Sequence, residues 1–152
     1  WSLGRALLSL LRPCDPQGAR AELARLGLAD KWQQHCGELS GGQLQRARFA
    51  RVTLQDSPLV LLDEPYGAID ANTVRDLAAL VRQWHGEGRT VISVLHDFEH
   101  VRQEYPETLM LAREAIAHGK TAEVLSEENL LRSRRLAEAQ GDFSHAPVCH
   151  VD

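Results

Sequence analysis

Hydrophobic residues recur at steps of three and four through the first third of the chain. This spacing predicts a short helix over residues 2–11 and a second helix that begins at Asp15-Pro16 and ends at Gly27. A third helix is expected to begin after Ser40. Its apolar side is predicted to consist of Leu44, Ala47, Ala50 and Leu54. We therefore expect a helical region at the start of the chain.

The pattern becomes strand-like after Pro58. Residues 59–62 form an uninterrupted apolar run, which is typical of a buried strand in a parallel sheet, and residues 90–95 form a second, β-branched run. A helix is predicted between them over residues 72–85. One face of that helix is expected to consist of Val74, Leu77, Val81 and Trp84. These elements predict a right-handed parallel βαβ unit whose two strands end at the same edge of the sheet.

Shorter elements are predicted in the last third of the chain. Residues 107–113 and 115–118 are expected to form an edge hairpin whose strands join near Arg113-Glu114, with Gly119 closing the turn before a helix resumes. From Ser133 onward no periodicity is sustained, which predicts a flexible tail over residues 133–152. The order of elements predicts an α/β fold.

Composition supports one soluble globular unit with a buried core. Of the 152 residues, 43% are hydrophobic and 25% are charged, and the formal net charge is −4. No apolar run approaches the roughly 18 residues that a membrane-spanning helix needs. A mildly acidic chain also lacks the basic face that nucleic-acid binding requires, so we expect no nucleic-acid partner.

The cysteines and methionine add two expectations. Three cysteines without a CxxC pair argue against a disulfide framework and favour a reducing compartment, with the cytoplasm as the default. The chain begins with Trp1, and its single methionine is Met110. We therefore expect that an N-terminal portion of the protein is missing.

The segment Ser40-Gly41-Gly42 lies where the third helix is predicted to begin. A helix start leaves backbone N–H groups without intrahelical acceptors, and glycine permits an oxyanion to approach them closely. The same residues also suit an ordinary helix cap followed by a tight turn. The segment is therefore a candidate anion-binding site with a structural alternative.

Two adjacent carboxylates, Asp63 and Glu64, follow the first apolar strand. One carboxylate can hold a hydrated Mg²⁺ while the other polarises a water molecule, although such a pair could instead cap the next helix. His96 follows the second strand, where an imidazole could donate a hydrogen bond to a phosphate oxygen, although most histidines are ordinary surface residues.

These segments together resemble the ATP-binding subunits of ABC transporters in their order and spacing. The resemblance covers about residues 27–125. The matching segments are Leu39-Ser40-Gly41-Gly42-Gln43 with Gln45-Arg46, Val60-Leu61-Leu62-Asp63-Glu64-Pro65, Gly67-Ala68-Ile69-Asp70, and His96-Asp97. The resemblance implies an incomplete P-loop NTPase-like domain of the ABC ATPase type, with a helical subdomain over about residues 1–57 and a core over about 58–132.

The resemblance also implies roles for individual residues in binding and hydrolysing ATP with Mg²⁺. Asp63 would organise Mg²⁺ through water, Glu64 would be the general base, and His96 would contact the γ-phosphate. The residues facing nucleotide would be Ser40, Gly41, Gly42, Gln43, Asp63 and Asp70. Much of that nucleotide would be held by a second ATPase subunit in a head-to-tail dimer. Asp70 would join the two subunits, although Ile69 stands where the family usually has leucine. The segment Leu39-Ser40-Gly41-Gly42-Gln43 resembles the family's signature motif, and Gln43 and Arg46 would support this loop, unless they are simply solvated.

The phosphate-binding loop of the family is missing. No GxxxxGK[ST] sequence occurs in the chain, and Gly119-Lys120-Thr121 copies only its end, so we interpret that segment as a turn. We therefore expect that this chain alone neither holds nucleotide tightly nor hydrolyses it.

Partners and cargo follow from the same resemblance. It implies a transmembrane permease, an indirect role for a substrate-binding protein, and a peripheral position on the cytoplasmic face of the plasma membrane. Residues 84–91, 108–113 and 121–125 resemble zinc or manganese importers, and the tail adds a hypothetical zinc-binding set, His145, Cys149 and His150. The alternatives are a soluble ABC ATPase of DNA repair or translation, and a catalytically silent interaction module.

Overall fold

The computed structural model describes residues 16–138 of the chain. It divides the chain into two compact units, Trp1–Leu95 and His96–Asp152, and each is described here by itself. The predicted helix over residues 2–11 lies outside the described residues.

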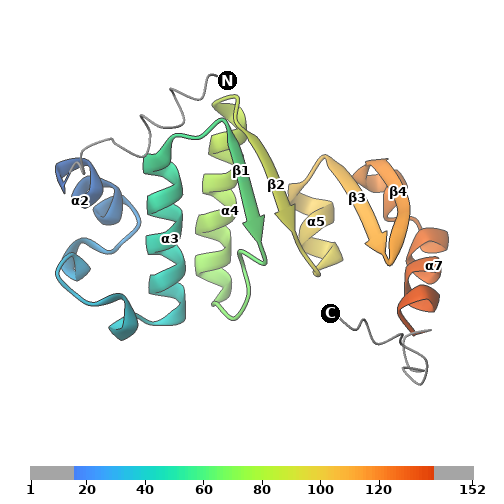
Figure 1. The fold of residues 1–152 in the computed structure, drawn as a ribbon, viewed down its shortest axis with the longest axis horizontal. Helices are drawn as coiled ribbons and strands as arrows, with labels where there is room; N and C mark the ends of the chain where they lie inside the picture. The colour runs from blue at the N-terminus through green and yellow to red at the C-terminus, as the bar shows by residue number, and fades with distance from the viewer. Residues whose placement is uncertain (1–15, 139–152) are drawn as a thin grey trace, which may run out of the picture. The chain divides into compact units, whose positions relative to one another are not determined.

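The first unit contains a parallel βαβ motif preceded by helices (Figure 1). Its elements are α2 (Pro16–Arg25), η1 (Ala29–Lys31), η2 (Cys36–Glu38), α3 (Gly41–Gln55), β1 (Leu59–Asp63), α4 (Ala71–Gly86) and β2 (Thr90–Val94). Strands β1 and β2 pair in parallel, with Leu59 opposite Thr90 and Asp63 opposite Val94. The predicted strand–helix–strand order is therefore confirmed. The structure also places two short 3₁₀ turns between α2 and α3 that the sequence pattern did not predict.

The core of the first unit lies between the two long helices and one face of the sheet. Helices α3 and α4 lie side by side in Figure 1, and the ring of Phe49 stacks on that of Trp84 with the centroids 5.4 Å apart. The buried residues of this core are Phe49, Val60, Leu62, Leu77, Leu80, Val81 and Trp84. The predicted apolar side of α3 was partly wrong, because Leu54 is 43% exposed while Phe49 is 2% exposed. Helix α3 turns Phe49 toward Trp84, which leaves Leu54 outside the contact.

The opposite face of the same sheet is apolar and exposed. Leu59, Leu61, Ile92 and Val94 are 48%, 68%, 55% and 52% exposed, respectively. The prediction of a fully buried strand is therefore wrong for this chain, because side chains alternate along β1 and only Val60 and Leu62 reach the core. Within the described part of the first unit, residues 16–95, helices cover a single face of the β1–β2 sheet.

The second unit is built on the predicted antiparallel hairpin. Its elements are α5 (Phe98–Glu104), β3 (Glu107–Ala112), β4 (Glu114–Lys120), α6 (Thr121–Val124) and α7 (Glu127–Glu138). The chain reverses at Arg113, whose φ is +62°, and Gly119 and Lys120 belong to β4. The interpretation of Gly119-Lys120-Thr121 as a turn is therefore wrong, because a strand there leads directly into a helix.

Two further features of the second unit bear on the sequence predictions. Thr121 is 4% exposed, and its hydroxyl donates to the Tyr105 carbonyl at 2.5 Å, so this threonine is committed to packing. Helix α7 continues to Glu138, past Ser133, where we expected a tail to begin. Across residues 16–138, no helix has the length and apolarity needed to cross a membrane.

Candidate functional site

Helix α3 begins with a reciprocal hydrogen-bonded cap. The Gln43 amide donates to Ser40 Oγ at 3.3 Å, and the Ser40 amide donates to Gln43 Oε1 at 3.0 Å. The amides of Gly41 and Gly42 lie between these two bonds, at helix positions that have no intrahelical acceptor. The helix start therefore presents two adjacent amides that an anion could use, on a backbone that the cap holds rigid.

The two glycines contact the loop that leads into α4. A Cβ at Gly42 would lie 3.6 Å from Thr73 Oγ1, and one at Gly41 would lie 3.7 Å from the Ala68 carbonyl oxygen. Both distances are ordinary van der Waals separations, so packing within this unit does not require glycine at either position. The absence of side chains keeps the amides open to a ligand.

Asp70 caps the start of α4. Its carboxylate accepts hydrogen bonds from the amides of Asn72 and Thr73, both at 3.0 Å, and from the Thr73 hydroxyl at 2.7 Å. The Thr73 hydroxyl in the first place, and the backbone amides after it, lower the pKa of Asp70. The start of α4 is therefore capped by Asp70 and not by Asp63 or Glu64, which removes the capping alternative for that pair.

Arg46 links α3 to α4. Its Nη2 donates to Thr73 Oγ1 at 3.0 Å and to Asp76 Oδ2 at 3.1 Å, and Thr73 is 3% exposed. Gly27 has φ +74°, and a Cβ there would lie 3.2 Å from Arg46 Nη1. The guanidinium therefore bridges Thr73 and Asp76 on α4, and its predicted support of the loop at residues 39–43 stays a prediction.

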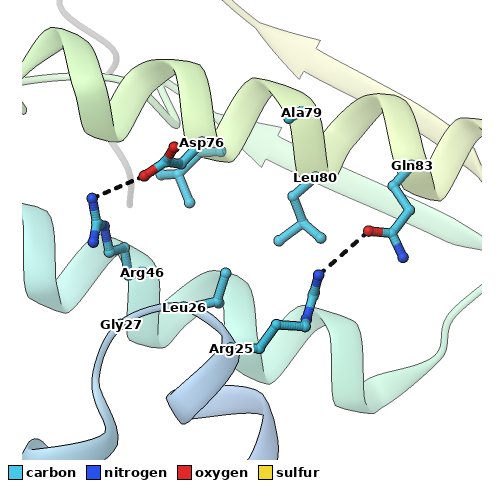
Figure 2. A pocket seen from close by; sticks show the side chains of 9 residues that line it. Arg25, Leu26, Gly27, Arg46, Asp76, Ala79, Leu80 and Gln83 are labelled. Carbon is cyan, nitrogen blue, oxygen red and sulfur yellow. Dashed lines mark hydrogen bonds and ion pairs between the residues drawn. The ribbon is translucent and has the colours of Figure 1, made fainter.

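Arg46 also lies at the edge of a groove with a volume of about 450 Å³ (Figure 2). On the other side, Arg25 donates to Gln83 Oε1 at 3.4 Å and pairs with Glu22 at 2.6 Å, and the hydrogen bond to Glu22 raises the pKa of Arg25. The groove is lined by Arg25, Leu26, Gly27, Arg46, Asp76, Leu77, Ala79, Leu80 and Gln83. None of the predicted site residues lines it, and both arginines are engaged in pairs, so it is not the candidate nucleotide site.

Asp63 and Glu64 lie at the carboxyl end of β1, as predicted. Asp63 is the last residue of the strand and is exposed. Glu64 has φ +43°, a left-handed conformation that is unusual for a side chain larger than glycine. Its amide donates to the Val94 carbonyl and its carbonyl accepts from the Gly67 amide, both at 3.1 Å. The backbone of Glu64 is thus held on both sides in a strained conformation.

Gln45 holds the residue after Glu64, and sequence reasoning missed this contact. Its Nε2 donates to the Pro65 carbonyl at 2.8 Å, and Pro65 is among the fully buried side chains. The sequence offered one signal for it, the Gln45-Arg46 pair that follows the segment at residues 39–43.

His96 is exposed and is the first residue of the second unit. Asp97 follows it and caps α5 through the amides of Glu99 and His100, at 2.9 and 3.2 Å. The predicted proximity of His96 to Glu64 stays a prediction. His145, Cys149 and His150 lie outside the described residues, and residues 16–138 contain no group of three or more His, Cys, Asp or Glu side chains that could hold a metal ion.

Comparison with known proteins places these features in a class. The ABC transporter family matches residues 14–67. The chain is 46% identical over 107 residues to a phosphonates import ATP-binding protein of Pseudomonas syringae pv. tomato, covering 70% of this chain and 40% of that protein. A phosphonates import ATP-binding protein of Pseudomonas putida is 40% identical over 131 residues, with 86% and 49% covered.

Solved structures of ABC transporter proteins also match this chain. An ABC transporter of the metal-chelate type in an inward-facing conformation matches with a TM-score of 0.72 at 28% identity, covering 82% of this chain and 51% of that one. An ATP-binding cassette of an ABC transporter in its ADP conformation matches with a TM-score of 0.67 at 22% identity, which concerns the fold alone. It covers 81% of this chain and 52% of that one.

The fold, the motifs and these matches define a class of fold: the described residues form an incomplete domain of the ABC ATPase type, similar to part of the ATP-binding cassettes of ABC transporters. Within that class it is similar to the phosphonates import ATP-binding proteins of Pseudomonas, of whose length it spans about half.

Proposed function

We propose that the chain forms one portion of an ATP-hydrolysing subunit that drives import through a membrane permease. The observation that carries this proposal is the start of α3. There Ser40 and Gln43 hold the backbone amides of Gly41 and Gly42 in place, and packing within this unit does not require glycine at either position. Such a start suits the terminal phosphate of a nucleotide. The similarity to import ATP-binding proteins supports the same assignment.

The roles proposed for the described residues follow their positions. ATP with Mg²⁺ supplies, when bound, the phosphoryl group whose transfer to water releases free energy. Asp63, exposed at the end of β1, suits a Mg²⁺-bound water, and Glu64 accepts the proton of the attacking water. His96 donates a hydrogen bond to the γ-phosphate.

The proposal includes a second subunit. Ser40, Gly41, Gly42 and Gln43 of one copy face the γ-phosphate of a nucleotide held mainly by the other, in a head-to-tail dimer, and Asp70 contacts the partner. The subunits dock on a permease at the cytoplasmic face of the plasma membrane and are served indirectly by a substrate-binding protein.

The exposed face of the β1–β2 sheet supports the proposal that further polypeptide completes the domain. Parallel sheets are almost always covered on both faces, and here four apolar side chains are left in solvent. The chain spans 40% and 49% of the first two relatives, and in those relatives the remaining length is long enough to cover such a face. We propose that the further polypeptide also supplies the phosphate-binding loop.

The cargo is proposed to be a phosphonate. The relatives described above carry that name at 40% to 46% identity, whereas the zinc or manganese expectation rests on segments that do not touch cargo. A metal ion or metal chelate is kept as the second candidate, because the solved transporter of metal-chelate type is 28% identical to this chain.

A hybrid protein tests the ATPase proposal. In the hybrid, this chain replaces the matching segment of the Pseudomonas syringae pv. tomato relative, which supplies the remaining length. We expect the hybrid to hydrolyse ATP, and Glu64→Gln to lower kcat by about 100-fold or more while ATP remains bound, as loss of a general base should. The chain by itself should hydrolyse no ATP. An inactive hybrid, or an active Glu64→Gln variant, contradicts the proposal.

Growth distinguishes the two cargo candidates. A strain that lacks its own phosphonate ATPase subunit should grow on a phosphonate as its only phosphorus source when it receives the hybrid. Rescue of a zinc- or manganese-uptake mutant without rescue on phosphonate would instead support the metal candidate.

A further inference from the structure

The strained conformation of Glu64 needs a constraint. Its left-handed φ of +43° persists only if neighbouring groups hold the backbone. Two of these groups are the Val94 carbonyl and the Gly67 amide, each 3.1 Å from the Glu64 backbone. Val94 ends the neighbouring strand, and Gly67 belongs to the turn that contains Glu64. Neither group therefore connects Glu64 to the helices of the unit.

Gln45 provides that connection. It lies in α3, one turn beyond the cap at Ser40, and its Nε2 donates to the carbonyl of Pro65 at 2.8 Å. On the other side of the amide, Arg48 Nη1 donates to Gln45 Oε1 at 3.3 Å, which fixes which end of the amide faces Pro65. The peptide that follows Glu64-Pro65 is therefore tied to α3 by an oriented hydrogen bond.

Helix α3 is stiff between the cap and Gln45. The capping box closes its first turn. Arg46, the residue after Gln45, is anchored by its side chain to Thr73 on α4. The start of α3 is therefore joined to Gln45 through a hydrogen-bonded first turn, and the helix is fixed to α4 one residue further on.

We infer that Gln45 is a positioning residue for Glu64, which couples the start of α3 to the orientation of the proposed general base. The inference rests on the proposed function, since Glu64 acts as a base only if ATP is hydrolysed. Gln45 does not touch the reacting atoms. It holds the Pro65 carbonyl, so that the Glu64 carboxylate points to the same place in each turnover.

The first test measures hydrolysis by the hybrid. Gln45→Met keeps the length of the side chain and removes the donor. We expect kcat to fall about tenfold, as a small misplacement of a catalytic group does, with KM for ATP within about twofold. Arg51→Ala, at an exposed arginine of the same helix, is the matched control and should keep kcat within about twofold.

The outcomes separate the two proposals. An inactive unaltered hybrid contradicts the proposed function. An active hybrid whose kcat is unchanged by Gln45→Met contradicts the inference and leaves the proposed function standing. A rise in KM with unchanged kcat also overturns it, because that result would place Gln45 in nucleotide binding.

The second test needs no hydrolysis and uses the chain as it is. Amide hydrogen exchange should show that Gln45→Met lowers the protection of the Gly67 and Glu64 amides about fivefold, the effect of one lost hydrogen bond. Amides in the middle of α4, such as those of Leu80 and Val81, should be unchanged. An equal loss at all these amides would show that Gln45 only stabilises the fold, and no loss at Gly67 would show that it does not hold the turn.

Discussion

The two faces of the β1–β2 sheet differ sharply although they come from the same two strands. On one face, Val60 and Leu62 pack under helices α3 and α4, and on the other, Leu61 and Ile92 are 68% and 55% exposed. The side chains are equally apolar, so sequence alone does not distinguish the faces. The difference shows that the covered face stabilises this unit, whereas the exposed apolar face is suited to contact with further polypeptide.

The largest expected effect comes from removing the centre of the covered face. Trp84 is 0% exposed and stacks on Phe49, so Trp84→Ala should lower the free energy of unfolding by about 3–5 kcal/mol. Leu61→Ala, on the open face, should change it by less than about 0.5 kcal/mol. Urea unfolding followed by circular dichroism measures both. Similar losses for the two variants would mean that the open face is already packed in solution.

A smaller loss is expected from the polar link under the covered face. Thr73→Val removes a buried hydroxyl that accepts from Arg46 and donates to Asp70, and should cost about 1–2 kcal/mol. A double-mutant cycle with Arg46→Met should show a coupling of about 1 kcal/mol. Additive losses would contradict the idea that the two side chains act through one hydrogen bond.

The cap of α3 is expected to contribute less to the free energy of unfolding than the Thr73 hydroxyl does. Ser40→Ala removes the acceptor for the Gln43 amide and should lower stability by about 1 kcal/mol. Ser40→Thr keeps a hydroxyl and should cost clearly less. Thermal unfolding of the three proteins compares them, and equal midpoints for the wild type and Ser40→Ala would show that the capping bond is not formed in solution.

The smallest expected effect is a change in the stability of the fold with pH. The Thr73 hydroxyl and the amides at the start of α4 hold the pKa of Asp70 below its ordinary value of 3.8. A lowered folded pKa gives stability that is fully present above the ordinary value and is lost as pH falls through the folded pKa. Denaturation at decreasing pH should therefore bring the wild type and Asp70→Asn closer together in stability. A constant difference between them would exclude this contribution.

The local elements could be predicted because their signals are local. Ser40 before two glycines, the apolar run after Pro58 and the helical spacing up to Trp84 each lie within a few residues, and each gave the right element. The turn near Arg113-Glu114 was predicted and is confirmed, whereas the turn expected at Gly119 was wrong, because a glycine there suggested a turn but lies within β4.

The arrangement of the site could be predicted only in part. The motifs placed Asp63 and Glu64 at a strand end, which the structure confirms, but the hydrogen bond from Gln45 to Pro65 joins residues twenty positions apart. Such a contact depends on how α3 packs, which no local pattern specifies. The exposure of Leu61 was also unpredictable, because a run of apolar residues does not say how many layers of protein are present to cover it.

The βαβ motif of β1, α4 and β2 is formed by one continuous stretch of chain, and this has a consequence for the order of folding. Each pairing contact, such as that of Leu59 with Thr90, closes a single βαβ crossover, so forming the parallel pair loses less entropy than adding strands from more remote segments would. We expect this stretch to acquire protection early in refolding and to act as the nucleus on which later segments assemble.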